Sequence, residues 1–258
     1  MNTAEVSMQG GGLYNENSSL QELAVDKSVE LLSPDGYRET SITLADYGSS
    51  EGENSIRLFS KYLAKLPAIS SAVLIFNDTS TNDFSSLSTT INISWSDHSH
   101  NGKLAIRTLL SPRSFFQQVL PDNSTDAGFS FTALHWLQNM PDHLPGAPEI
   151  SVAAHHDLVS FLSCRFKEIR SHGTLTFGVP IDGPLSVIPA HKCLEMALSK
   201  LSSTYQIDPS IISRLLFYIR TMDEILAAVA VVDGQWHLKS HHTIPVVHPM
   251  WPSPTEVG

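Results

Sequence analysis

The chain has 258 residues, 41% of them hydrophobic, and its 16 Lys and Arg against 26 Asp and Glu give a formal net charge of -10. This length is enough to bury a full core, so we expect one domain over residues 1–258, and the scattered basic residues argue against a nucleic-acid partner. There is no apolar run of about 18 residues, no signal-peptide pattern and only two cysteines, which argues against a membrane span and a disulfide framework and predicts a cytoplasmic location.

The first half of the chain alternates helical and strand patterns. Apolar positions at helical spacing predict a helix over residues 18–32, with a serine as its N-cap. Residues 43–47 predict the first strand, and residues 55–66, apolar on one face, predict the helix that follows. The continuous apolar run 72–76 is typical of a strand buried on both faces of a parallel sheet.

The middle of the chain continues this alternation after a polar, serine-rich region. Residues 103–110 predict a third strand, and residues 127–137 predict a fourth that is followed directly by a helix start. A long helix is expected over residues 152–169, with His172-Gly173 as its C-terminal stop, and residues 174–179 predict the next strand. Strand, helix and strand at this spacing predict right-handed crossovers and a parallel sheet.

The last third is less regular. Residues 188–225 have helical character with a break at Asp208-Pro209. Residues 226–232 and 236–247, joined at Asp233-Gly234, predict a terminal antiparallel hairpin. The expected fold is therefore α/β, with a mainly parallel central sheet, a terminal antiparallel hairpin and a helical cap.

An acidic glycine loop follows the first strand, in the stretch "LADYGSSEGENS" of residues 44–55. A strand, a loop and a helix start usually bind phosphate, but no Lys follows the last glycine, the G-x-G-x-x-G spacing is absent, and Asp46, Glu51 and Glu53 would repel an anion. Asp78 ends the next strand, where a carboxylate can accept both ribose hydroxyls. The pattern favours a cofactor with a cationic centre and no phosphate, such as S-adenosylmethionine. A solvated acidic loop beside a helix-capping Asp78 is the competing interpretation.

Five stretches carry a resemblance to a known family. They are "GLYNENSSLQ" at 12–21, "LADYGSSEGEN" at 44–54, "IFNDTSTNDF" at 75–84, "SPRSFFQQVLP" at 111–121 and "ALHWLQNMP" at 133–141. In this order they resemble the motifs YxxNSxxQ, ADLGCSSGPN, xxNDLPxNDF, VPGSFYxRLFP and SLHWLSQVP of the SABATH carboxyl methyltransferases, which methylate salicylate, jasmonate and theobromine-type substrates. The resemblance implies a Rossmann-like class I methyltransferase, S-adenosylmethionine as cofactor, a small acid as substrate and a possible homodimer.

The resemblance also implies an organisation for the chain. Residues 1–35 would form an N-terminal lid and substrate segment, and residues 183–225 a helical cap insertion. Since the family's chain normally continues further, we expect a divergent member that lacks part of the C-terminal region.

The resemblance implies that eight residues surround the cofactor. They are Tyr14, Ser18, Asp46, Gly48, Asn54, Asp78, Ser114 and Phe115. Asp46 and Asn54 can meet the methionine end, and Asp78 the ribose. Phe115 can stack on adenine, with Ser114 near the adenine amino group. Ordinary core packing is the competing interpretation for Phe115.

Gln21 and Trp136 match the family positions that grip the substrate carboxylate through an amide and an indole N–H. An ionised carboxylate is already a nucleophile, so its methylation needs in-line alignment and exclusion of water rather than a general base. Thr132 and His135 complete the expected substrate-binding set, although His135 could instead face a helix. The twelve histidines show no zinc-site spacing, so no metal is expected.

Two other hypotheses stay open, because Glu51, Glu53 and Arg113 depart from the family motifs. In the first, the fold is kept without methyl transfer and catalyses a cyclisation, pericyclic, dehydration or isomerisation step in specialised metabolism. In the second, the chain is a non-catalytic partner subunit.

Overall fold

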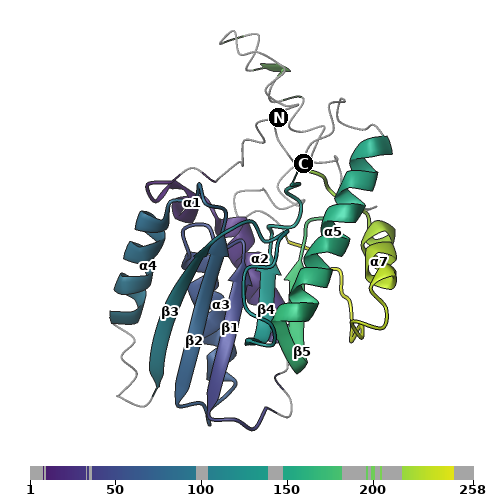
Figure 1. The fold of residues 1–258 in the computed structure, drawn as a ribbon. Coiled ribbons are helices and arrows are strands. Elements are labelled where there is room, and N and C mark those ends of the chain that lie inside the picture. The colour runs from purple at the N-terminus through teal and green to yellow at the C-terminus, as the bar shows by residue number, and fades with distance from the viewer. Residues whose placement is uncertain are drawn as a thin grey trace, which may run out of the picture.

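The computed structural model describes residues 10–32, 37–96, 104–138, 148–181 and 217–246, together with positions 8, 34, 196, 199, 200 and 204. Five strands form one sheet in the order β3-β2-β1-β4-β5 (Figure 1), and every ladder between them is parallel. Their bounds are β1 Ser41–Tyr47, β2 Ser71–Asp78, β3 Ala105–Pro112, β4 Thr125–Phe131 and β5 Ile169–Gly178. The expected parallel, Rossmann-like sheet is confirmed.

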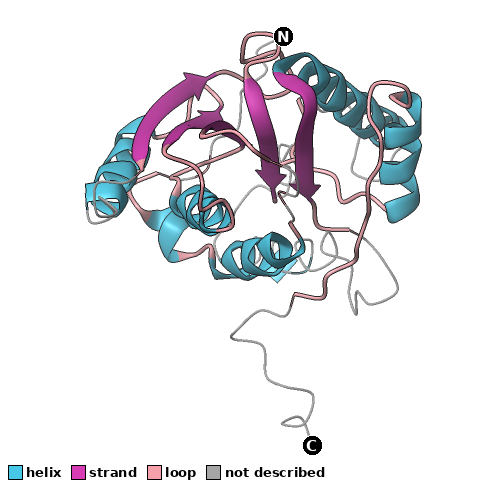
Figure 2. Cartoon of the chain, turned by 90° about the horizontal axis from the view of Figure 1, so that it is seen from below, coloured by secondary structure: helices cyan, strands magenta, loops and turns pink. Residues whose placement is uncertain are grey.

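Helices cover both faces of this sheet (Figures 1 and 2). The described helices are α1 Leu13–Glu16, α2 Ser19–Leu31, α3 Glu53–Ala64, α4 Phe84–Ser96, α5 Pro148–Glu168 and α7 Met222–Val231. Helices α2, α3 and α4 pack on one face and α5 and α7 on the other, since the buried apolar residues divide into two large clusters along these lines. The strands supply both clusters because successive side chains point to opposite faces.

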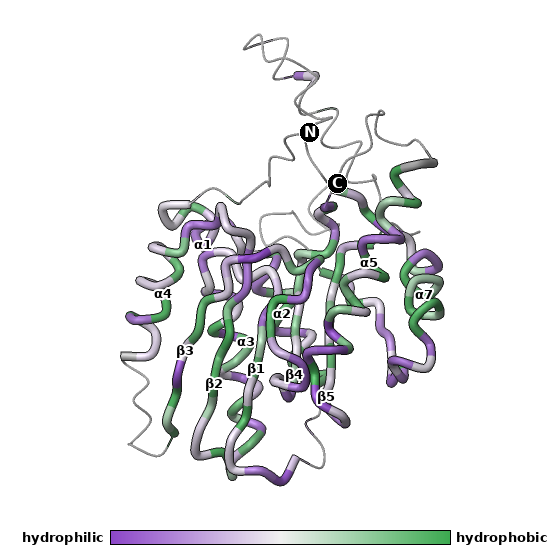
Figure 3. The backbone as a smooth tube through the Cα atoms, in the orientation of Figure 1, coloured by the Kyte–Doolittle hydropathy of each residue, from purple (hydrophilic) through white to green (hydrophobic). Residues whose placement is uncertain are grey.

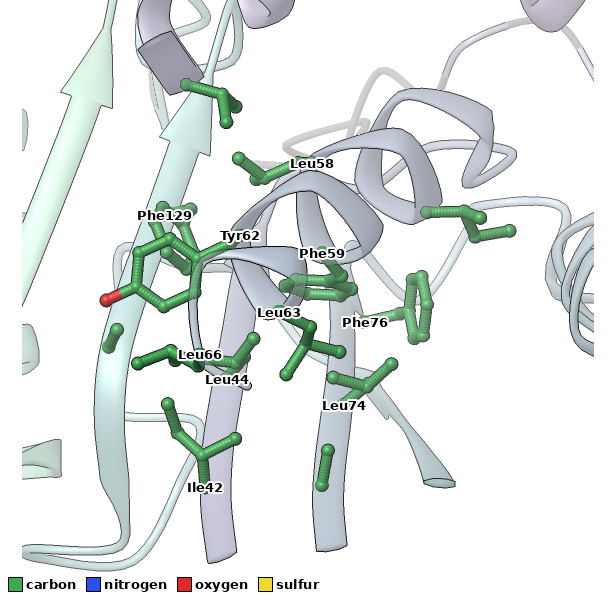
Figure 4. Packing of buried hydrophobic residues seen from close by; sticks show 14 of the residues in the cluster. Ile42, Leu44, Leu58, Phe59, Tyr62, Leu63, Leu66, Leu74, Phe76 and Phe129 are labelled. Carbon is green, nitrogen blue, oxygen red and sulfur yellow. The ribbon is translucent and has the colours of Figure 1, made fainter. Parts of the chain in front are cut away.

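The core on the α3 side combines aliphatic and aromatic side chains (Figure 4). Phe59 packs edge-on against Phe76, with ring centroids 5.3 Å apart, and Tyr62 packs against Phe129 at 5.1 Å. Hydrophobic residues concentrate along the central strands, as Figure 3 shows. Apolar spacing in α3 and the continuous apolar run in β2 thus predicted this part of the core correctly.

The strand order also locates a crevice. From β1 the chain crosses to β2 and β3 on one side and then returns to β4 on the other side of β1. In an open parallel sheet, such a reversal leaves a crevice at the carboxyl ends of the two strands that flank it. Residues after β1 and β4 therefore lie where a ligand site is expected.

The sequence pattern did not predict helix α4. Residues 84–96 form α4, although their many serines, threonines and β-branched residues are weak helix formers. Asp83 caps the helix by accepting the Ser86 amide at 3.0 Å, and Leu87 and Ile91 are buried against the core. Packing and capping outweigh propensity here.

The expected boundaries on either side of α5 were wrong. β4 ends at Phe131, not near residue 137, and residues 132–138 form a turn rather than a helix start. The expected helix stop at His172-Gly173 lies inside β5, because α5 ends at Glu168 and the strand begins at once. His172 has a φ of 68°, and the register with β4 shifts nearby, so these two residues mark an irregularity within the strand.

The prediction of a terminal antiparallel hairpin was also wrong. Residues 226–232 fall in and just after α7, whose N-terminus carries a complete capping box between Thr221 and Glu224. The apolar run resembles a strand, but Ile225, Ala228 and Val232 recur at helical spacing and pack in the cluster on the α5 side. Residues 237–246 contain no strand. Most of the expected cap over 183–225 lies outside the described residues.

Candidate functional site

A pocket lies at the carboxyl ends of β1 and β4, where the strand order predicts a crevice. Ten residues line it: Tyr14, Val25, Asp46, Gly48, Ser49, Asn54, Ser55, Leu58, Phe131 and Thr132. Its cavity volume is only about 10 Å³, which is room for about one water molecule. Five of the residues predicted from the sequence therefore meet in one place, and the N-terminal segment contributes Tyr14 to it.

Gly48 brings the loop after β1 close to the end of β4. Its φ is 101°, and a Cβ at this position would lie 2.3 Å from the Cβ of Ala133 and 3.6 Å from a ring carbon of Phe115. The Gly48 amide donates to the carbonyl of Asn77 at 2.8 Å, which ties the loop to the end of β2. Only glycine satisfies both the left-handed backbone and this close approach.

Asp46 is the buried charge of the pocket. Its side chain is 6% exposed, and one carboxylate oxygen accepts the Ser55 hydroxyl at 2.5 Å. The net effect raises the pKa of this carboxyl to about 7: burial raises it most, the Ser55 hydrogen bond partly lowers it, and the charge of the nearby Asp78 raises it. None of the lining residues is a lysine or arginine that could offset the burial. A carboxylate in this position is stabilised either by a proton or by a cationic ligand.

Tyr14 places its hydroxyl beside the same carboxyl. Burial, and next the charge of Asp46, raise the pKa of Tyr14 to about 12, while the neighbouring Thr132 and Asn54 side chains act in the opposite direction. Asn54 approaches without completing a hydrogen bond of normal geometry, since its Nδ2 is buried and has no partner among the described residues. Thr132 is a β-branched residue with a φ of 54°, which stores backbone strain at the wall of the pocket.

The acidic loop suggested that Glu51 could face the cofactor pocket, but Glu51 is not among the residues that line it. Its side chain is 1% exposed, and its two oxygens accept the amides of Gly12 at 2.6 Å and Asn15 at 3.0 Å. Glu53 is exposed at the first residue of α3. In the sequence, Glu51 and Glu53 look like equivalent charges in one loop. In the structure, only Glu51 holds the N-terminal segment.

Asp78 and Ser18 lie outside the lining. Asp78 is half-buried at the end of β2, and it accepts the amide of Ser50 at 2.6 Å and that of Thr79 at 2.8 Å. Its carboxylate therefore holds the glycine loop from the strand end. Ser18 is 3% exposed and donates to the carbonyl of Asn15 at 3.2 Å, just before α2.

Phe115 and Ser114 occupy the loop after β3. Phe115 is 6% exposed and packs edge-on against Phe161 with 6.0 Å between the ring centroids, so it is part of the core while its ring also lies near Gly48. The Ser114 hydroxyl accepts the amide of Phe116 at 3.4 Å. Core packing and a place beside the glycine loop are thus compatible for Phe115.

A buried ion pair that sequence reasoning missed supports this loop. Arg165 is fully buried on α5, and it donates to the carbonyls of Phe115 at 2.7 Å and Gln117 at 2.8 Å. Its guanidinium pairs with Glu168 at 2.9 Å, and that carboxylate also accepts the Tyr47 hydroxyl. Two signals were available: the spacing of Arg and Glu by three residues on a predicted helix, and the similarity of residues 161–173 to the family motif FLxxRxxELxxGG.

Two of the residues expected to bind the acceptor, His135 and Trp136, form a second group after β4. Trp136 is half-buried, with its ring 5.2 Å from that of His135 and 6.2 Å from that of Phe217. Burial, and next the charge of Arg220, lower the pKa of His135 to about 4, so its imidazole is neutral at pH 7. Gln21 is half-buried in the first turn of α2. None of Gln21, His135 and Trp136 lines the closed pocket.

Arg220 fastens this second group to the rest of the fold. It is 2% exposed and donates to the carbonyl oxygens of Leu134 and Ala154, while the amide of Tyr218 donates to the carbonyl of His135 at 2.7 Å. Across the ranges that the structure describes, no three His, Cys, Asp or Glu side chains gather as a metal site would require. Nor is any helix in those ranges long and apolar enough to cross a membrane.

Comparisons with known proteins agree with this arrangement. The family model described as "SAM dependent carboxyl methyltransferase" matches residues 4–154. The chain is 35% identical over 184 residues to the methyltransferase LUC1 of Fusarium sp, and 34% identical over 194 residues to the O-methyltransferase acrG of Aspergillus aculeatus. Each match covers 66% of this chain and 50% of the relative, so the chain spans about half the length of these curated relatives.

A likeness in fold extends further along the chain. A solved structure of loganic acid methyltransferase with SAH superposes with a TM-score of 0.69 at 19% sequence identity, covering 88% of this chain and 75% of the other. At this level of identity the superposition shows a shared fold alone.

Proposed function

Because this chain belongs to the family of S-adenosylmethionine-dependent carboxyl methyltransferases, we propose that it methylates a carboxylate, or another oxygen, of a small natural-product acid. The observation that carries the proposal is Asp46, a buried carboxylate with no cation among the residues that line its pocket. S-adenosylmethionine fits this requirement, since it brings an ammonium and a sulfonium and no phosphate. When bound, it supplies a methyl group on a positively charged sulfur.

The chain's own residues can hold such a cofactor. Asp46 would accept the ammonium, and the unpartnered Nδ2 of Asn54 would donate to the carboxylate of the methionine part. Asp78 would accept the ribose hydroxyls, while Ser114 and Phe115 would border the adenine. The described contacts of Asp78 and Phe115 already fix both beside the glycine loop.

We assign acceptor binding to the second group together with Gln21 and Thr132. Gln21 and Trp136 would donate to the acceptor carboxylate, and Thr132, which lines the pocket, would also contact the acceptor. His135 would meet the acceptor as a neutral imidazole, because its lowered pKa keeps a charge away from a reaction that needs no general base. Methyl transfer would then be accelerated by alignment of the reacting atoms and by the exclusion of water, to which Tyr14 would contribute.

The test begins with calorimetry of the purified chain and S-adenosylhomocysteine, followed by mass spectrometry of a panel of small acids incubated with S-adenosylmethionine. The proposal expects binding and a gain of one methyl in at least one acid, with both lost in Asp46→Ala. Turnover of an acid without methyl gain, unharmed by Asp46→Ala and Asp78→Ala, would favour the non-methylating enzyme. A stable complex with another chain and no turnover alone would favour the partner subunit.

Location and assembly belong to the same proposal. A cytoplasmic location is supported by the composition, with its two cysteines, and a homodimer is supported by the habit of the family that the motifs resemble. Cell fractionation and light scattering of the purified chain test the two expectations separately.

A further inference from the structure

We propose that Glu51 is a positioning residue: its carboxylate holds the N-terminal segment, residues 10–18, against the glycine loop, so that Tyr14 closes the pocket and controls cofactor exchange. The inference rests on the proposed function for the identity of the ligand.

Both oxygens of the Glu51 carboxylate are used to hold the segment. Oε1 accepts the Gly12 amide at 2.6 Å and Oε2 accepts the Asn15 amide at 3.0 Å, with the side chain 1% exposed. These partners lie 39 and 36 residues earlier in the chain, so the contact joins two separate elements. Hydrogen bonds to a charged acceptor are among the strongest that a protein makes.

The backbone on both sides is shaped for this contact. Ser50 and Gly52, which flank Glu51, have φ values of 47° and 90°. On the opposite side Gly11 and Gly12 have φ values of 77° and 87°, a conformation that glycine adopts without strain. The Gly11 amide donates to Asp83 at 3.0 Å, so neighbouring amides of the segment are held by carboxylates from two different elements.

Tyr14 lies between the two amides that Glu51 holds, and its side chain lines the pocket. The pocket has a volume of about 10 Å³ in this closed arrangement, far less than an S-adenosyl compound requires. Because Tyr14 borders this space, we infer that the segment moves when a cofactor enters or leaves. The hydrogen bonds to Glu51 oppose this movement, because they must break before the segment can leave the glycine loop.

The matched test compares Glu51→Ser with Glu53→Ser. Serine is the residue that the resembling family motif has at position 51, so the first variant is expected to fold, and the second removes an exposed carboxylate from the same loop. In the ligand-free proteins, hydrogen exchange of residues 10–18 should rise roughly 10- to 100-fold in Glu51→Ser and stay unchanged in Glu53→Ser. Exchange of the central strands should be the same in both.

Stopped-flow binding of S-adenosylhomocysteine separates loss of the hydrogen bonds to Glu51 from general damage to the fold, because general damage would not accelerate association. Association and dissociation should both become about tenfold faster in Glu51→Ser, because entry no longer waits for the segment to open. In a Tyr14→Ala background, Glu51→Ser should add little to either rate, since it acts through Tyr14.

Unchanged exchange of the segment would overturn the inference, and so would raised exchange with an unchanged association rate. If the wild-type chain binds no S-adenosylhomocysteine, the proposed function fails at that step. The exchange comparison in the ligand-free proteins still decides whether Glu51 holds the segment.

Discussion

Replacing Asp46 by asparagine should make the protein more stable at alkaline pH. The carboxyl of Asp46 is buried, and its pKa is raised from 3.8 to about 7, chiefly by loss of hydration. A raised pKa means that the folded state holds the proton more tightly than the unfolded state does. This contribution to stability is fully present below about pH 4 and is lost as pH rises through about 7. The asparagine amide is neutral at every pH, so Asp46→Asn removes the loss.

The difference between 3.8 and about 7 corresponds to on the order of 4 kcal/mol at pH 8. Structural relaxation reduces this, and we expect Asp46→Asn to gain about 1–4 kcal/mol at pH 8 and about a quarter of that gain at pH 4.5. Urea denaturation at both pH values measures the gain, with Glu53→Gln as the exposed control. A variant less stable than wild type at pH 8, or equally stabilised at both pH values, would refute the reasoning.

The same carboxyl should make cofactor binding depend on pH in the opposite direction. If only ionised Asp46 accepts the ligand ammonium, the Kd of S-adenosylhomocysteine should rise roughly eightfold between pH 7.5 and pH 6. About half a proton should be released on binding at pH 7, which calorimetry in two buffers of different ionisation enthalpy detects. The Asp46→Asn variant should bind weakly at every pH and release no proton at this site.

Three further changes test the framework around the pocket. Gly48→Ala should destabilise the fold by about 2 kcal/mol or more and abolish cofactor binding, because its Cβ would meet that of Ala133; thermal melting and calorimetry measure the two effects. Glu168→Ala should cost about 3–5 kcal/mol in urea denaturation, since it leaves the Arg165 guanidinium buried without its carboxylate. Thr221→Ala should cost about 1 kcal/mol by removing the cap of α7, and an unchanged free energy of unfolding would contradict the capping box.

Sequence reasoning succeeded where burial decides the local structure. The continuous apolar run 72–76 predicted β2, and the β-branched residues before Leu44 predicted β1. It failed where contacts far along the chain decide. Helix α4 is held by Leu87 and Ile91 against the core, and α7 by Ile225 against the α5 side, and neither contact can be derived from local propensity.

The candidate site divides in the same way. Asp46, Gly48 and Asn54 follow from the motif of one loop, so the sequence located them, and the structure brings Tyr14 and Thr132 to the same pocket. Glu51, in the same loop, could not be understood from the sequence, because its partners belong to the N-terminal segment. A residue's charge can be read from the sequence, whereas its neighbours depend on the fold.

Two arginines that are buried in the described part of the chain have a consequence for divergence among relatives. Arg165 and Arg220 each fasten a loop by donating to main-chain carbonyls, at Phe115 and Gln117 in one case and at Leu134 and Ala154 in the other. Every residue type offers a carbonyl, so mutation of the fastened residues leaves the attachment in place. Selection can therefore vary the walls of the cofactor and acceptor regions while the two arginines keep both loops in position, and chimaeras exchanging these loops should preserve the scaffold.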